Sequence, residues 1–201
     1  KEFCYHEIPE KLDPYDFEAF KNSKTAFYVT CSNVETGEPE YLRITDMKEQ
    51  IDLMRASASL PYVSRLVEAD GMKLLDGGCT DSIPVEKFRE MGYTKTVVVL
   101  TRNRGYVKKP ENEKLTGIYY RHYPNFVEAL KTRHMRYNET VQKIEELERE
   151  GKIFVIRPSQ ELTIGRTERN PIKLQETYET GRRDALCRMK DLIEWWNKAE
   201  K

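Results

Sequence analysis

The sequence predicts an α/β fold followed by a helical C-terminal extension. Between residues 27 and 101 strand-like and helix-like segments alternate, and this alternation is typical of layered α/β domains. The last of these strands contains an unbroken apolar run, residues 97–100, of the kind found in strands buried on both faces of a parallel sheet. Long apolar stripes at helical spacing dominate the rest of the chain. We therefore divide the chain into an α/β part, residues 1–110, and a helix-rich extension that packs on it, residues 111–201.

The first elements form a predicted hairpin and a helix. Residues 27–34 are rich in aromatic and β-branched side chains, which favour strands. The turn-rich residues 35–39 then lead into a second short strand at 41–44. An Asp and a Glu three residues apart, at 46–49, have the pattern of a capping box. Apolar residues at helical spacing follow, so we expect a helix that ends near Arg55.

The middle of the chain contains short elements joined by tight connections. Small residues followed by a proline, at 56–61, predict a tightly packed, non-helical connection. An apolar strand then ends at Asp76, and a helix with Pro84 near its first position stops at Gly92. Residues 96–101 form the predicted strand of a parallel sheet.

After residue 101 a basic loop at 102–116, which Pro and Gly interrupt, leads into the extension. A mostly apolar stripe, at steps of three and four residues from Val127 to Glu148, then predicts a long amphipathic helix. A further strand is expected at 152–157. The pair Asn170-Pro171 opens a last helix with a broad apolar face. We expect that face, which includes Trp196, to pack in the core or against another subunit.

The balance of basic and acidic residues argues against a nucleic-acid partner. Lysine plus arginine and aspartate plus glutamate both number 34 among the 201 residues, so the formal net charge is zero. A chain without a basic excess exerts no long-range attraction on nucleic acid or an anionic membrane, and we expect no nucleic-acid partner. No apolar run approaches the ~20 residues that cross a bilayer, so no transmembrane segment is predicted.

The cysteines argue against disulfides and metals. Cys4, Cys31, Cys79 and Cys187 are irregularly spaced without a C-x-x-C pair, and the chain has three histidines. This pattern predicts neither a disulfide framework nor a structural zinc site, and we expect no metal or organic cofactor. A reducing cytoplasm is the expected location.

The strand that ends at Asp76 carries the main candidate site. Asp76 is followed by Gly77 and Gly78, two residues without a Cβ atom that allow other groups to come close. Open α/β sheets place their chemistry at the C-terminal ends of strands, so Asp76 is our candidate catalytic residue. Because Asp-Gly is also a common turn dipeptide, a plain turn is the alternative.

Two motifs that follow one another in the sequence strengthen the interpretation of Asp76 as a catalytic residue. The stretch Ala-Ser-Ala-Ser-Leu-Pro-Tyr at 56–62 precedes Asp-Gly-Gly at 76–78 and Asp-x-Ile-Pro-Val at 81–85. Together they resemble the second half of a patatin-like phospholipase domain, over roughly residues 25–101. The C-terminal part, including Arg157-Pro158 and residues 166–169, is similar to the tail of a bacterial branch of that family.

The resemblance implies a serine acyl hydrolase with a Ser-Asp dyad. In that scheme the serine lies in G-x-S-x-G at a strand-to-helix elbow, and a glycine-rich loop stabilises the oxyanion. Asp76 matches the acid that partners the serine, and Gly77 and Gly78 complete the motif. The implied fold is a three-layer α/β/α patatin-like sheet, of which residues 1–110 are the C-terminal half. The implied substrate is a lipid or fatty-acyl ester. The sequence leaves the oligomeric state open, and a homo-oligomer is one alternative.

The chain departs from the family pattern at the nucleophile. None of its glycines begins G-x-S-x-G, and no glycine-rich oxyanion segment is present. A hairpin with half of a parallel sheet would expose an unpaired edge, so we expect the first half of the domain upstream in the same protein. The alternative is a non-catalytic remnant that serves as an interaction or regulatory module. A nucleotide-binding domain is disfavoured because G-x-G-x-x-G and the P-loop motif are absent.

Other reactive residues have simpler structural explanations. We expect Ser57 and Ser59 to pack or cap, and Cys79 and His134 to lie in cores. His122 is expected to be an exposed loop residue. Two groups of residues have both a functional and a structural interpretation. The basic residues Arg102, Arg104, Lys108 and Lys109 either contact phosphate or carboxylate head groups or are simply solvated. Trp195 and Trp196 either contact a lipid interface or pack against other side chains.

Overall fold

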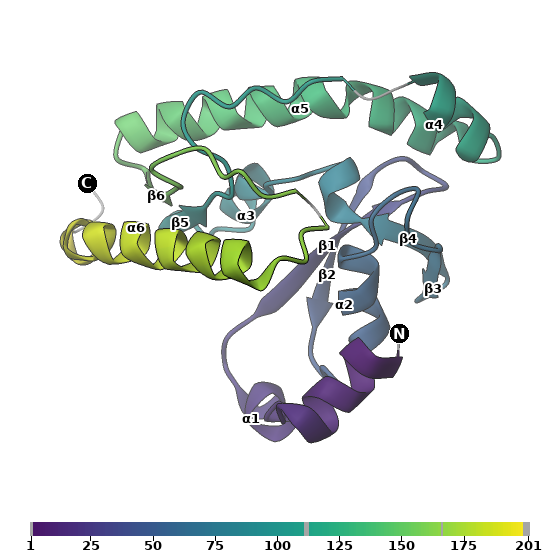
Figure 1. The fold of residues 1–201 in the computed structure, drawn as a ribbon, viewed down its shortest axis with the longest axis horizontal. Helices are drawn as coiled ribbons and strands as arrows, with labels where there is room; N and C mark the ends of the chain where they lie inside the picture. The colour runs from purple at the N-terminus through teal and green to yellow at the C-terminus, as the bar shows by residue number, and fades with distance from the viewer. Residues whose placement is uncertain (1, 111–112, 166, 199–201) are drawn as a thin grey trace. The chain divides into compact units, whose positions relative to one another are not determined.

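The computed structural model describes residues 2–110, 113–165 and 167–198, and it contains helices and strands in alternation (Figure 1). This mixture, with a long helix at the C-terminus, confirms the α/β fold followed by a helical extension. Arg166, part of the tail motif in the sequence, lies outside the described residues. In the described part of the chain, every helix is too short or too polar to cross a membrane.

The chain divides into two compact units, each built from two stretches of sequence. The first unit contains residues 1–83 and 109–137, and the second contains residues 84–108 and 138–201. One long helix, α5 (Pro124–Arg149), contributes to both units. The boundary near residue 110 and the packing of the extension on the α/β part therefore stay predictions.

The first unit contains a four-stranded sheet in the order β2-β1-β4-β3. Its strands are β1 (Phe27–Asn33), β2 (Pro39–Ile44), β3 (Val67–Ala69) and β4 (Met72–Asp76). All neighbouring strands are antiparallel, which confirms the hairpin of β1 and β2. The prediction that the strand ending at Asp76 belongs to a parallel sheet is wrong. The short β3 precedes β4 in a tight hairpin, and such connections join only antiparallel strands.

Helices cover both faces of this sheet, so the first unit has three layers (Figure 1). On one face α2 (Ile51–Ser57) packs on a core that includes Leu74. On the other face the N-terminal half of α5, preceded by α4 (Glu113–Tyr119), packs on a core that includes Leu75. Consecutive residues of β4 thus point into different cores, as the pleat of a strand requires.

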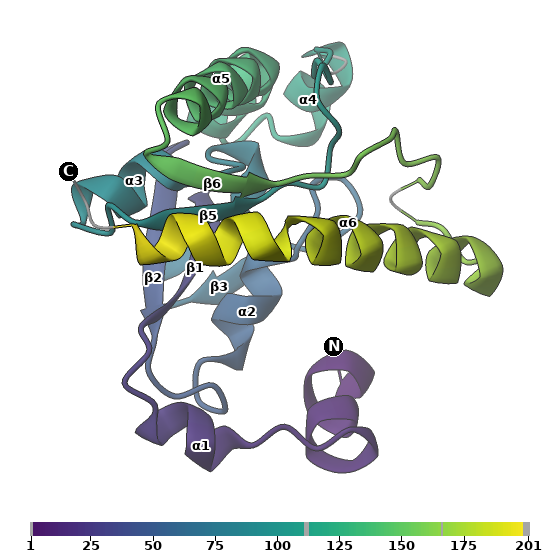
Figure 2. The same cartoon turned by 90° about the vertical axis from the view of Figure 1, so that its left-hand side faces the viewer.

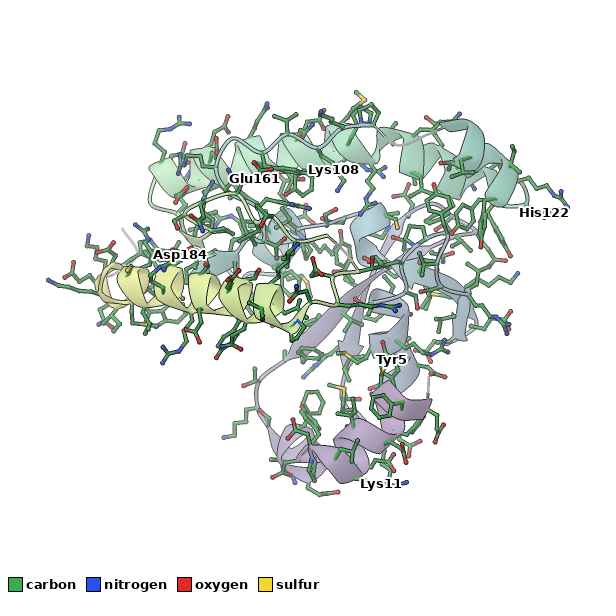
Figure 3. All side chains as sticks on the ribbon, viewed as in Figure 1. Tyr5, Lys11, Lys108, His122, Glu161 and Asp184 are labelled. Carbon is green, nitrogen blue, oxygen red and sulfur yellow. The ribbon has the colours of Figure 1, made fainter. Side chains whose placement is uncertain are left out.

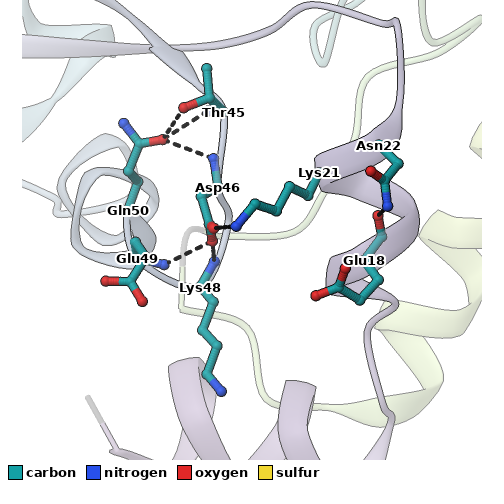
Figure 4. Close-up of polar contacts among 8 residues, drawn as sticks. All are labelled: Glu18, Lys21, Asn22, Thr45, Asp46, Lys48, Glu49 and Gln50. Carbon is teal, nitrogen blue, oxygen red and sulfur yellow. Dashed lines mark hydrogen bonds and ion pairs between the residues drawn. The ribbon is translucent and has the colours of Figure 1, made fainter.

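The start of α2 shows how a local pattern fixes a turn (Figure 4). Asp46 Oδ1 accepts the backbone N–H groups of Lys48 and Glu49, as the capping pattern predicts. The returning side chain is Gln50 rather than the predicted Glu49, and its Oε1 accepts the backbone N–H of Asp46. Lys21 donates to Asp46 at 2.7 Å, and this contact lowers the pKa of Asp46.

Two helical segments precede the sheet. They are η1 (Phe3–Leu12), a wide π-helical segment without buried side chains, and α1 (Phe17–Asn22). Asp16 caps α1 by accepting the N–H of Ala19 at 2.8 Å. Phe20 of α1 packs edge-on against Phe27 at the start of β1, with 5.8 Å between ring centroids. This contact joins α1 to the sheet.

The second unit contains the parallel pair β5 (Thr96–Val99) and β6 (Ile153–Ile156). The helix α3 (Val85–Glu90) precedes β5, and α6 (Pro171–Asn197) runs alongside β6 (Figure 2). The prediction that the apolar strand is buried on both faces is wrong, because Val99 is 70% exposed. In the described part of the chain β5 pairs with β6 alone, so the pair lacks the neighbouring strands of a larger parallel sheet.

The last helix begins as predicted, with Asn170 accepting the backbone N–H of Ile172. Its packing residue is Trp195, whose ring lies 5.9 Å from that of Phe154 and whose Nε1 donates to Gly151. Much of the predicted apolar face is exposed. Its exposed members are Tyr178, Leu186, Met189, Ile193 and Trp196. The expectation that Trp196 lies in a core is therefore wrong, whereas packing against another subunit stays a prediction.

Candidate functional site

Asp76 is the last residue of β4, and its backbone is fixed on both sides. Its N–H donates to the carbonyl of Ser59 at 2.9 Å, and its carbonyl accepts the Ser32 hydroxyl at 2.8 Å. Cys31 of β1 is its partner across the antiparallel ladder. The side chain is half-buried, and its Oδ1 accepts the N–H of Gly78 at 2.7 Å. The strand end therefore holds the carboxylate in one orientation.

The space around the turn requires glycine at position 77 and is tight at position 78. A Cβ atom on Gly77 would overlap the carbonyl of Thr30, with its carbon only 2.5 Å away. A Cβ atom on Gly78 would lie 3.0 Å from Asp76 Oδ1 and 3.4 Å from Arg133 Nη2. Both glycines belong to a single 3-10 turn, η2 (Gly77–Cys79). The turn therefore keeps the Asp76 carboxylate, β1 and an arginine of α5 within one packed cluster.

Two arginines of α5 bind the carbonyls of this turn. Arg133 Nε donates to the Gly78 carbonyl at 2.5 Å, and Arg136 Nη2 donates to the Cys79 carbonyl at 3.1 Å. Arg133 is buried, with 8% of its surface exposed. Neither arginine is among the site residues that the sequence predicts. A signal was present, because Arg133 follows the buried Leu130 at helical spacing and so falls on the apolar stripe.

The two oxygens of the Asp76 carboxylate have different environments. Oδ1 is held by the N–H of Gly78, whereas Oδ2 has no hydrogen-bond partner within the described residues. A carboxylate with one oxygen fixed and the other available can accept a proton from a group placed opposite it. The nearby Asp81 is arranged differently, because its two oxygens accept the Tyr41 hydroxyl and the N–H of Ile83. Asp81 therefore closes the turn.

The cysteines next to Asp76 do not form a nucleophilic site. Burial, aided by the negative charges of Asp76 and Glu40, raises the pKa of Cys31 to about 12. A thiol with that pKa stays protonated at neutral pH and is a poor nucleophile. Cys79 is fully buried in the core beneath α5, as predicted.

The other candidates also have structural roles. Ser57 donates to the carbonyl of Thr30 at 2.8 Å, and the buried Ser59 donates to that of Arg55 at 2.7 Å, which confirms their packing and capping roles. His134 bonds through Nδ1 to the Lys131 carbonyl of its own helix. His122 is exposed, as predicted (Figure 3). Within the described ranges no cluster of three or more His, Cys, Asp or Glu side chains could hold a metal ion.

Comparison with known proteins gives two findings. Residues 123–197 match the model of a domain of unknown function, DUF6363. The chain is also 34% identical over 80 residues to the uncharacterized protein YjjU of Escherichia coli strain K12. That match covers 39% of this chain and 22% of the length of YjjU. The segment that matches DUF6363 contains Arg133 and Arg136, whereas Asp76 lies outside it.

Proposed function

We propose that this chain supplies the acid of a Ser-Asp dyad in a patatin-like serine acyl hydrolase that cleaves lipid or fatty-acyl esters, phospholipids included. One observation carries the proposal. The Asp76 carboxylate has one oxygen fixed by the Gly78 N–H and one without a partner in the described chain. It lies in a turn where a Cβ atom on Gly77 would overlap Thr30 and one on Gly78 would crowd the carboxylate itself. A plain surface turn does not need this packing.

In the proposed reaction Asp76 acts on a serine that this sequence does not contain. As the serine oxygen attacks the ester carbonyl, Asp76 Oδ2 accepts the hydroxyl proton and negative charge develops on the carbonyl oxygen. Backbone N–H groups of an oxyanion loop stabilise that charge. Asp76 then returns the proton to the departing alcohol, and a water molecule repeats the sequence to release the fatty acid. The scheme uses no metal or organic cofactor.

The serine and the oxyanion loop belong, in this proposal, to the first half of the domain in the same protein. We place the protein in the cytoplasm, where thiols stay reduced, because none of its four cysteines, each within the described chain, forms a disulfide. We also propose that it forms a homo-oligomer through the exposed apolar face of α6, which includes Leu186 and Ile193.

The test is to read the complete coding sequence and to treat the complete protein with a fluorophosphonate, which labels activated serines. We expect one labelled serine within an upstream G-x-S-x-G motif, and a long-chain fatty-acyl ester should compete with the label. Ser57 and Ser59 serve as internal controls and should stay unlabelled. A complete protein without that motif and without labelling contradicts the proposal.

A second function is favoured by the exposed apolar stripe of α6. A long helix with Tyr178, Leu186 and Ile193 exposed is typical of an interaction surface, and the DUF6363 match covers this helix rather than Asp76. The second proposal is a non-catalytic module that binds another protein chain. Absence of the upstream serine motif, with an intact fold, would favour this module over the hydrolase.

A further inference from the structure

A pocket of about 390 Å³ opens in the second unit. Its walls come from the loop after β5, the C-terminal turn of α5, the end of β6 with the residues that follow, and the middle of α6, where Figure 3 labels Asp184. The charged residues that line it are Arg104, Glu148, Arg157, Asp184 and Arg188. The volume falls in the range of pockets that hold small organic molecules.

One carboxylate organises two of the arginines. Glu148 Oε2 accepts Arg104 Nη2 at 3.0 Å and also accepts Arg157 Nη2. Arg157 Nη1 donates to Glu145 at 3.4 Å, and only 11% of the Arg157 side chain is exposed. Arg157 is therefore a fixed wall of the pocket, and Glu148 is neutralised by two guanidinium groups.

The remaining donors belong to Arg104 and Arg188. Arg104 gives one N–H to Glu148, and Arg188 gives one to Asp191 at 3.3 Å. Each guanidinium has five N–H groups, so each keeps donors without a partner in the described chain. The Arg188 guanidinium also lies over the Phe154 ring, 4.7 Å from its centroid, which restricts its position.

The charge of the lining favours an anion. Three guanidinium groups face two carboxylates, and both carboxylates are already engaged. Glu148 binds two arginines, and Asp184 Oδ2 accepts the N–H of Ser159 at 2.9 Å. A cation would have to displace these contacts, whereas an oxyanion would use the unpaired arginine N–H groups.

We propose that this pocket binds a small organic phosphate monoester. Arg104 and Arg188 would donate to the phosphate oxygens, whose three acceptor atoms suit two guanidinium groups better than the two oxygens of a carboxylate do. Val155 and Pro158 supply apolar surface for the organic part. This inference is independent of the proposed hydrolase, because none of its residues belongs to the Asp76 cluster.

The experiment titrates the 201-residue chain with glycerol 3-phosphate at fixed ionic strength and follows backbone amide shifts by NMR. We expect saturable shifts at Arg104, Ser159 and Arg188, and none with glycerol. Replacing Arg188 with Gln should weaken binding about tenfold, because a charge-assisted hydrogen bond is lost. Replacing Arg183 with Gln is the matched control, since it removes the same charge from α6 outside the pocket.

A second arm distinguishes a soluble ligand from a lipid headgroup. Vesicles that contain phosphatidic acid present the same phosphate monoester, and phosphatidylcholine vesicles are the control. Binding of either monoester that depends on Arg188 supports the pocket and tells which source it uses. The proposal is overturned if neither produces saturable shifts at about 10 mM phosphate monoester, or if Arg183→Gln weakens binding as much as Arg188→Gln does.

Discussion

β4 has an Asp-Gly pair at each end, and the two pairs are built differently. Asp70 and Gly71 form the hairpin turn with β3, and both have positive φ angles, 51° and 74°. A Cβ atom on Gly71 would meet nothing within 4 Å. Asp76 has a φ of −46°, and a Cβ atom on Gly77 would overlap Thr30. Glycine is needed for backbone conformation at the first turn and for space at the second.

The difference shows that an Asp-Gly dipeptide alone does not reveal why its glycine is needed. At the first pair the reason is local, because the tight hairpin turn requires a positive φ, which glycine adopts readily. The second pair depends on groups distant in the sequence, including Arg133, which lies 55 positions beyond Gly78. Only the second pair holds its aspartate within a packed cluster, and this supports a functional role for Asp76 over a plain turn.

The largest expected effect on stability comes from alanine at the two glycines. Gly77→Ala should lower the free energy of unfolding by at least about 3 kcal/mol, because β1 or the turn has to move. Gly71→Ala should lower it by about 1 kcal/mol, the cost of a left-handed alanine. Urea denaturation of both variants measures the difference. Equal losses would show that the two turns are alike.

A smaller effect is expected from the arginine that binds the second turn. Arg133→Met should lower the free energy of unfolding by about 2 kcal/mol and speed hydrogen exchange of the Gly78 N–H, because the Gly78 carbonyl loses a charged donor. Lys131→Met on the same helix is the control. Its exposed ion pair with Glu128 is worth less than about 0.5 kcal/mol. Unchanged exchange at Gly78 in Arg133→Met would rule out its positioning role.

The thiol beside Asp76 makes stability depend on pH. The Cys31 pKa is raised from 9.0 to about 12, so between these values the unfolded chain loses a proton that the folded chain keeps. The free energy of unfolding therefore falls as the pH rises through this window. Tyr120, whose pKa burial raises to about 12, contributes with the same sign.

Urea denaturation at about pH 8 and about pH 10.5 tests this dependence. Cys31→Ala should show a smaller loss of stability between the two pH values than the unmodified chain. Cys187→Ala, which removes an exposed thiol, should keep the full loss. An identical pH dependence in Cys31→Ala would contradict the assignment.

Much of the fold follows from local sequence. The composition of β1 and β2, the Asn170 cap of α6 and the capping Asp46 all act within a few residues, so the sequence predicts them. The sequence predicts Glu49 as the side chain that bonds back to the Asp46 N–H, whereas the structure has Gln50. The error is small, because side chains three and four positions after a residue lie on the same face of a helix turn.

The parts that sequence does not predict depend on distant contacts. The amino-acid composition of the strands does not predict that β4 pairs antiparallel with β1. This pairing brings the Thr30 carbonyl into close contact with Gly77. Trp195 and Trp196 are neighbours of the same type, and only the position of Phe154 decides which one packs. The Asp76 motif is visible in the sequence, whereas its support by α5 emerges only from the fold.

The most direct test of the account compares Asp76, at the end of β4, with Asp70, in the turn before β4, in the complete protein. The measurement is kcat/KM for hydrolysis of a p-nitrophenyl fatty-acyl ester. We expect Asp76→Asn to lower it about 10³-fold, because a proton acceptor is lost, and Asp70→Asn to leave it unchanged. Circular dichroism checks that both variants fold. A folded Asp76→Asn variant that keeps the full rate, like Asp70→Asn, would contradict the account.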